Sequence, residues 1–251
     1  TGGRYQFTDA FAVFSENTYD LFGVHKAFSA GYGAEYRFDN GLALSALYEV
    51  GRVKDPSGDF DRDAVSLGAD YSDGERFEFS GRLEYRRDQG MIAGGPADTD
   101  TVAAIIAGSY DFSDASGLVF ALDLARTRTT SGSLPSGDYA RASIGYALRP
   151  IADDRLNLLG RYTFLHDMYG QQVDGAAAPG PVQTSHVFSL DATYELNQWW
   201  ELGGKIGMRL GESAPDKTQP LARNNAYLGV LNARYHFMNE WDALGEARYL
   251  Y

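Results

Sequence analysis

The chain has 251 residues and a formal net charge of -12, with 34 acidic residues, 22 basic residues and no cysteine. The acidic balance argues against a nucleic-acid partner, because phosphate binding needs clustered Lys and Arg. Without cysteine there is no disulfide framework and no thiolate site. No run of about 18 apolar residues occurs, which excludes a transmembrane helix.

Apolar and polar residues alternate with a period of two along the chain. In 76–87, Phe77, Phe79 and Leu83 share one side of an extended strand, while Glu78 and Glu84 share the other. About thirteen such segments occur, each about 9–13 residues long, which is the length of a tilted strand that crosses a bilayer. In chain order they are 4–15, 22–38, 42–54, 63–72, 76–87, 100–112, 117–129, 139–149, 155–166, 185–196, 200–211, 225–237 and 240–251. They predict one all-β domain over 1–251.

The connections between these segments alternate between short and long. The short ones are rich in turn formers and are 39–41, 72–75, 113–116, 150–154, 197–198 and 238–239. The long ones carry Gly, Pro, Ser and Asp and are 55–62, 88–99, 130–138, 167–184 and 212–224. Short periplasmic turns and long extracellular loops are typical of a transmembrane antiparallel up-and-down β-barrel. We therefore expect a location in the bacterial outer membrane.

Aromatic residues collect beside the short turns and predict a girdle at one membrane interface. The predicted girdle consists of Trp199, Trp200, Trp241, Phe38, Phe112 and Phe237. The polar sides of the strands carry charges of both signs, which cannot be buried dry without a large desolvation cost. We therefore expect a wet or polar lumen. Its predicted charged lining is Glu78, Arg82, Glu84, Arg86, Arg161, Asp191, Lys205, Arg209, Arg234, Glu246 and Arg248.

Strand parity predicts that the barrel is incomplete. Thirteen strands leave the last one running outward, whereas bacterial single-chain barrels have an even number. Closure would then need an odd number of further strands, or a partner chain, to cover the open edge. We expect about 14–16 strands in the complete barrel, and a longer protein whose export signal has been removed or lies upstream of Thr1.

Several stretches resemble the carboxy-terminal outer-membrane barrel domain of large bacterial cell-surface proteins. They are Asp153–Asn157, His186–Leu196, Gly203–Glu212 and Trp241–Leu250. The resemblance covers most of the chain and implies that about three further strands follow, in keeping with an even-numbered barrel. It also implies that the barrel displays or threads an upstream domain. It implies no catalytic residue.

Two groups of residues are weighed as sites. His166 and His186 flank the 167–184 loop, and His166 with Asp167 could serve a hydrolase at the rim. No nucleophile is fixed by spacing, so solvated rim histidines are the favoured interpretation. Asp59, Asp61 and Asp63 alternate as calcium ligands can, but the EF-hand spacing is not met. A solvated acidic loop is favoured there, and we expect no metal and no cofactor.

The leading hypothesis is an outer-membrane barrel that acts as a membrane anchor, pore or conduit with long extracellular loops. The expected partners are outer-membrane lipid, lipopolysaccharide and an upstream or partner domain in or on the barrel. We expect no enzymatic activity. The alternative is a barrel hydrolase with a rim active site, and a soluble all-β binding protein is a weaker third reading because the strands are long and two-faced.

Overall fold

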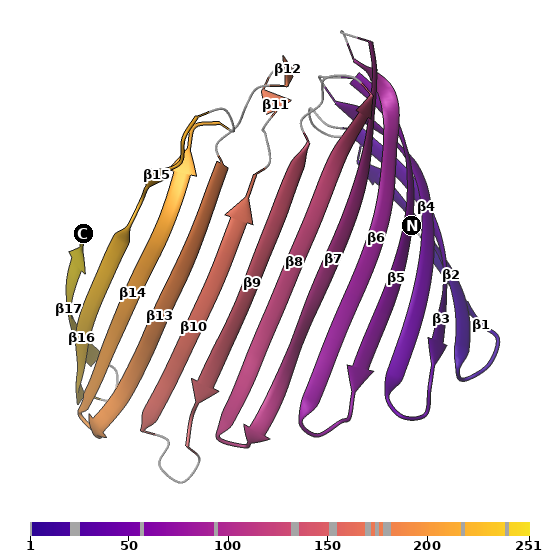
Figure 1. Cartoon of the computed structure of the whole chain (residues 1–251). Helices are drawn as coiled ribbons and strands as arrows, with labels where there is room; N and C mark the ends of the chain where they lie inside the picture. The colour runs from indigo at the N-terminus through magenta and orange to yellow at the C-terminus, as the bar shows by residue number, and fades with distance from the viewer. Residues whose placement is uncertain are drawn as a thin grey trace.

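The period-two segments form a continuous antiparallel meander in the computed structural model of the chain (Figure 1). The structure describes residues 2–20, 26–55, 58–92, 95–131, 136–150, 155–168, 172–173, 176–177, 182–216, 219–238 and 241–251. Strands dominate the described residues. No helix among them is long and apolar enough to cross a membrane.

The strands have the following bounds: β1 (Gly2–Gln6), β2 (Phe11–Asp20), β3 (Lys26–Arg37), β4 (Leu42–Asp55), β5 (Gly58–Ser72), β6 (Phe77–Ile92), β7 (Gly95–Ser113), β8 (Ser116–Ser131), β9 (Gly137–Leu148), β10 (Leu156–Asp167), β11 (Gln172–Val173), β12 (Ala176–Ala177), β13 (Val182–Asn197), β14 (Trp200–Ala214), β15 (Ala222–Arg223), β16 (Ala226–Met238) and β17 (Trp241–Leu250). The main sheet has 15 strands in the order β1 to β10, β13, β14, β16 and β17, with β15 paired to β14 off this path. Strands β11 and β12 form a separate hairpin. The predicted all-β, up-and-down architecture is confirmed.

The main path contains one strand more than predicted. Fifteen strands less β15 leave fourteen, because the predicted segment 4–15 is a hairpin of β1 and β2. In its turn, the Thr8 hydroxyl oxygen accepts the N–H groups of Ala10 and Phe11 at 3.3 and 3.0 Å. Apolar residues occur on both sides of this turn, and only the adjacent polar pair Thr8 and Asp9 interrupts the alternation.

This hairpin also changes the strand parity. Along a path of fourteen antiparallel strands, β1 and β17 run in opposite directions, as neighbours in an antiparallel barrel do. Antiparallel closure would therefore need direct pairing of these two edges or an even number of strands between them, not an odd number. In the structure the sheet is curved and open between β1 and β17 (Figure 1).

Two of the predicted long loops are strand instead. The β4–β5 and β6–β7 ladders continue to Asp55–Gly58 and Ile92–Gly95, so most of the predicted 55–62 and 88–99 loops is paired. The strict alternation of short and long connections is therefore wrong at these two hairpins. Parts of the predicted connections 130–138, 150–154, 167–184, 212–224 and 238–239 lie outside the described residues.

The register separates the sheet into two faces. Residues directly opposite each other in an antiparallel ladder lie on the same face. We call the side that carries Glu84, Arg161 and Asp191 the charged face, and the side that carries Leu83 and Leu190 the apolar face. Most buried side chains, including Phe60, Ser66, Thr99, Thr101 and Ser185, lie on the charged face. This crowding is expected on the inner side of a curved sheet.

Candidate functional site

The charged face brings together residues from nearly every strand of the path. By ladder register, all eleven charges predicted for the lumen lie on this face, from Glu78 on β6 to Arg248 on β17. The opposite face is apolar over the same strands, with Leu83, Val102 and Ile206 more than half exposed. Because only the apolar face can meet lipid without a large cost, the charged face is the one that we expect to line the interior of a barrel.

Cross-strand ion pairs neutralise much of the charged face. Lys205 Nζ lies 3.1 Å from Asp191 Oδ1, directly across the β13–β14 ladder. Arg141 donates from Nε to Asp123 at 2.8 Å across the β8–β9 ladder. The side chains of Lys205 and Asp191 are 45% and 38% exposed. Paired but solvated charges are typical of a wet surface, where each exposed pair contributes about 0.2–1 kcal/mol at most.

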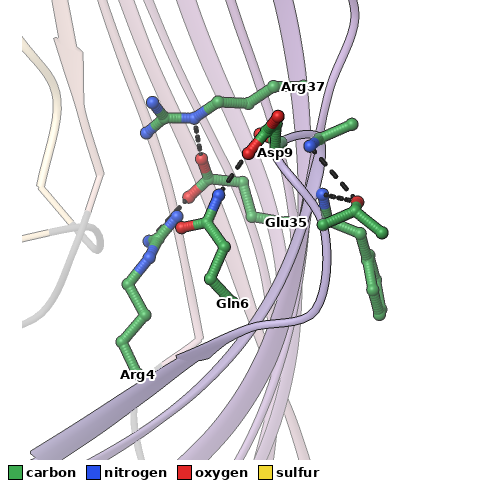
Figure 2. Close-up of polar contacts among 8 residues, drawn as sticks. Arg4, Gln6, Asp9, Glu35 and Arg37 are labelled. Carbon is green, nitrogen blue, oxygen red and sulfur yellow. Dashed lines mark hydrogen bonds and ion pairs between the residues drawn. The ribbon is translucent and has the colours of Figure 1, made fainter.

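At two places one carboxylate binds two arginines. Figure 2 shows Arg4 and Arg37 reaching Glu35 from two sides near the β1–β2 turn, with Arg4 Nη1 at 3.1 Å from Glu35 Oε2. In the same turn, Gln6 Nε2 donates to the carbonyl of Asp9 at 3.2 Å. Higher on the charged face, Asp88 accepts from Arg62 Nε at 2.7 Å and has Arg86 Nε at 3.2 Å. The geometry of this last contact does not make a hydrogen bond, so Arg86 Nε stays unsatisfied although the two charges are adjacent.

Some of the remaining predicted lumen charges also form ion pairs. Arg82 pairs with Glu84 at 3.3 Å, and Arg234 lies 3.8 Å from Glu201 across the β14–β16 ladder. Arg248 pairs with Glu246 along β17. Arg209 donates instead to the neutral Gln183 at 3.0 Å. Glu78 and Arg161 share the charged face with these residues.

Aromatic side chains gather at the end of the sheet where the short turns lie. Phe38 contacts Tyr36 with 4.7 Å between ring centroids, and Phe112 contacts Tyr110 at 5.2 Å. Trp200 contacts Tyr235 at 4.6 Å, and Phe237 stacks on the same tyrosine at 6.2 Å. Trp199 lies in the β13–β14 turn and Trp241 begins β17, both well exposed. All six residues therefore lie at the same end of the sheet, and their role as an interfacial girdle remains a prediction.

Three tyrosines mark the opposite limit of the apolar face, and sequence reasoning missed them. Each phenol hydroxyl is hydrogen-bonded to a polar side chain on the next strand. That side chain lies on the same face, two residues from the residue opposite the tyrosine and farther from the short turns. The pairs are Tyr48 with Asp63 at 2.9 Å, Tyr85 with Asp100 at 3.0 Å and Tyr162 with His186 at 2.8 Å. Only Tyr85 lies near the distal end of its predicted strand, whereas Tyr48 and Tyr162 lie nearer the middle of theirs, so no shared position in the sequence singles the three out.

The two aromatic levels define a band of bilayer thickness. On β6 the apolar-face positions run from Phe77 to Tyr85. Nine residues at about 3.3 Å each span about 30 Å along the strand, or about 23 Å along the membrane normal at a tilt of about 40°. An outer-membrane barrel has an apolar band of about 25 Å. Strand β6 then continues for seven residues to Ile92, beyond the band.

The three aspartates weighed as calcium ligands lie in the corresponding part of β5, beyond the apolar band, and not in a loop. They occupy apolar-face positions of β5 above Val65, and each has a partner on β4. The pairs are Asp59 with Lys54 at 3.0 Å, Asp61 with Arg52 at 2.8 Å and Asp63 with Tyr48 at 2.9 Å. Among the described residues, no group of three or more His, Asp or Glu side chains is placed to hold a metal ion.

The predicted hydrolase pair is not assembled. His166 lies on the apolar side of β10 and bonds through Nδ1 to the Thr184 hydroxyl at 2.9 Å. Asp167 follows it in the same strand, and successive residues of a strand point to opposite faces. His186 bonds to Tyr162 and does not meet His166. The two histidines therefore belong to the outer surface near the tyrosine level.

Comparisons with solved structures identify the fold. The ferric preacinetobactin receptor BauA from Acinetobacter baumannii matches with a TM-score of 0.59 and 12% identity, over 97% of this chain and 47% of that chain. The ferric citrate transporter FecA matches with a TM-score of 0.51 and 14% identity, over 95% of this chain and 43% of that one. The chain thus spans less than half the length of these two proteins. No protein-family model and no curated protein matches the sequence.

The two-faced sheet, its band of bilayer thickness and these likenesses define the class. The chain is a bacterial outer-membrane β-barrel protein. Its predicted location in the outer membrane is confirmed. At this level of identity the likenesses give the fold alone, so the resemblance to carboxy-terminal barrel domains of cell-surface proteins remains a prediction.

Proposed function

We propose that the barrel is a water-filled conduit through the outer membrane. The observation that carries this proposal is the solvated row of ion pairs on the charged face, represented by Asp191 and Lys205. Charged side chains at the depth of the bilayer need water or a polar filling beside them. The small side chains between these pairs, such as Ser143, Gly145 and Ser189, leave space inside the curved sheet.

The proposal assigns no catalytic chemistry to the chain. The one arrangement that favoured a hydrolase, His166 beside Asp167, is divided between the two faces of β10. In this proposal the charged face acts on passing ions through its electrostatic field and through the water beside it. Both signs of charge occur there, so we expect weak selectivity among small ions rather than exclusion of one sign.

Cysteine accessibility tests the conduit directly, because the natural chain contains no cysteine. Ser189 and Leu190 are adjacent on β13 and lie on the charged and apolar faces. We expect an anionic methanethiosulfonate reagent to label Ser189→Cys in bilayers and to reduce its single-channel current. The matched Leu190→Cys variant should resist the reagent, since its thiol faces lipid.

The two measurements separate the possible states of the lumen. Labelling together with measurable conductance supports an open conduit. Absence of both, in protein that shows the heat-dependent gel shift of a folded barrel, contradicts the proposal. That outcome would favour a barrel filled by an upstream or partner domain, which the sequence resemblance implies.

A further inference from the structure

Strand β8 changes character abruptly along its apolar face. Below the change, its outward positions carry four apolar residues in succession; above it, they carry two arginines. These positions are Leu118, Phe120, Leu122, Leu124, Arg126 and Arg128. A positive charge on the lipid-facing side is costly at the bilayer midplane and tolerated at the interface. The arginines therefore mark the top of the hydrocarbon layer.

Neighbouring strands change at the same level. Arg126 lies opposite Asp138 in the β8–β9 ladder, and Arg128 lies opposite Asp100 in the β7–β8 ladder. Asp100 also accepts the hydrogen bond of Tyr85, which lies at the upper aromatic level. Arg126 and Arg128 thus face outward at the depth where the lipid headgroups of the outer leaflet lie.

The two arginines line a hollow at this level of the sheet. It has a volume of about 460 Å³, and its other walls include Asp138, Met168, Val182 and Leu221. Its lining is therefore polar on the β8 side, while the other walls combine the apolar Met168, Val182 and Leu221 with the polar Gln219. A ligand that is both anionic and amphiphilic fits such a lining better than a small hydrophilic ion does.

The charge balance of the hollow favours an anion. It contains two guanidinium groups and one carboxylate, and Arg126 Nε lies 3.2 Å from Asp138 Oδ1. The side chains of this ion pair are 61% and 55% exposed, so water competes for both partners. Exposed pairs of this kind are weak and exchange readily with another ligand. Guanidinium groups bind phosphate oxygens in a bidentate geometry.

We propose that Arg126 and Arg128 bind the phosphate group of an outer-leaflet lipid. The phosphate lies between the two guanidinium groups, and the adjoining apolar part of the lipid contacts Met168, Val182 and Leu221. Arg126 and Arg128 follow Leu124 on the face that meets the bilayer, and this position identifies the source of the phosphate as a membrane lipid. The site is separate from the charged face and independent of whether the barrel conducts.

Titration with a phosphorylated glycolipid tests the proposal. The protein in detergent micelles is titrated with bisphosphorylated lipid A, and Kd is measured by thermophoresis. We expect the double variant Arg126→Gln/Arg128→Gln to bind about tenfold or more weakly, because charge-assisted hydrogen bonds are lost. The matched control, Arg76→Gln/Arg149→Gln, removes the same charge near the short turns and should keep the affinity of the natural chain.

Further arms decide the source of the phosphate and the role of the hollow. Dephosphorylated lipid A should bind weakly, and inorganic phosphate should compete only at far higher concentration. Asp138→Asn removes the competing carboxylate and should tighten binding, a gain that no loss of folding can imitate. Unchanged Kd in the double variant, equal binding of dephosphorylated lipid A, or inorganic phosphate binding as tightly as the lipid would each overturn the proposal.

Discussion

Lys205 on β14 lies directly opposite Asp191 on β13, on the charged face, with 3.1 Å between Nζ and Oδ1. Reversing one charge should change ion selectivity more than stability, because both side chains are over one-third exposed. We expect Lys205→Glu to raise the permeability of cations relative to anions, and to change the free energy of unfolding by about 1 kcal/mol or less. Reversal potentials in planar bilayers measure the first effect. The swap Asp191→Lys/Lys205→Asp should return the selectivity toward that of the natural chain.

The two faces should differ sharply in their tolerance of a charge. Leu190 is 42% exposed on the apolar face, near the middle of β13. We expect Leu190→Arg to lower the free energy of unfolding by about 2–4 kcal/mol, as arginine does against lipid at the midplane. Ser143→Arg is the control, since Ser143 lies on the charged face between Ala121 and Thr163. Urea unfolding in lipid vesicles measures both, and equal losses would contradict the assignment of the faces.

Substitution of two turn glycines should distinguish the cost of backbone strain from the cost of steric overlap. Gly41 and Gly74 have φ angles of 86° and 76°. A Cβ on Gly41 would lie 2.1 Å from the carbonyl oxygen of Ser72, whereas nothing lies within 4 Å of one on Gly74. We expect Gly74→Ala to destabilise by about 1–2 kcal/mol through strain alone. Gly41→Ala should destabilise by about 3 kcal/mol or more, because the overlap adds to the strain. Urea unfolding of the two variants in the same vesicles compares them, and equal losses would exclude the contact with Ser72.

The β5–β6 turn should respond to acid. Backbone N–H groups of Phe77, Glu75 and Arg76 donate to Asp73 and lower the pKa of its carboxyl below its ordinary value of 3.8. A lowered pKa in the folded state means that the stabilisation is complete above this ordinary value and is lost as the pH falls toward the folded pKa. We expect Asp73→Asn to be less stable than the natural chain at neutral pH, with the difference shrinking below pH 3.8. A difference that does not depend on pH would show that the carboxylate charge has no part in it.

Period-two alternation predicts most of this fold because the polarity of each residue indicates the face of the strand on which it lies. Leu83 and Glu84 differ in polarity and lie on the apolar and the charged face, so a local pattern predicts which face of the sheet each residue occupies. The same logic predicts the charged lining and the aromatic residues near the short turns. These features need only the identity of each residue and its neighbours.

The remaining features depend on where each pattern ends. Only the adjacent polar pair Thr8 and Asp9 interrupts the pattern between Phe7 and Phe11, so the turn bonded by Thr8 divides what the sequence predicts as one segment. Asp59 and Asp61 suggest a loop by composition, yet cross-strand partners on β4 keep them in a ladder. The hollow beside Arg126 joins residues from three separate connections, and no spacing in the sequence predicts that proximity.

Each ladder of the fourteen-strand path joins strands that are consecutive along that path. Closing one hairpin therefore brings together segments that are already near in sequence, and loop-closure entropy rises only slowly with the length of the connection. The sheet can grow by one hairpin at a time, each new strand pairing with the edge left by the previous one. Folding of this protein is then a directional addition of strands, in which the order of synthesis and the order of assembly can coincide.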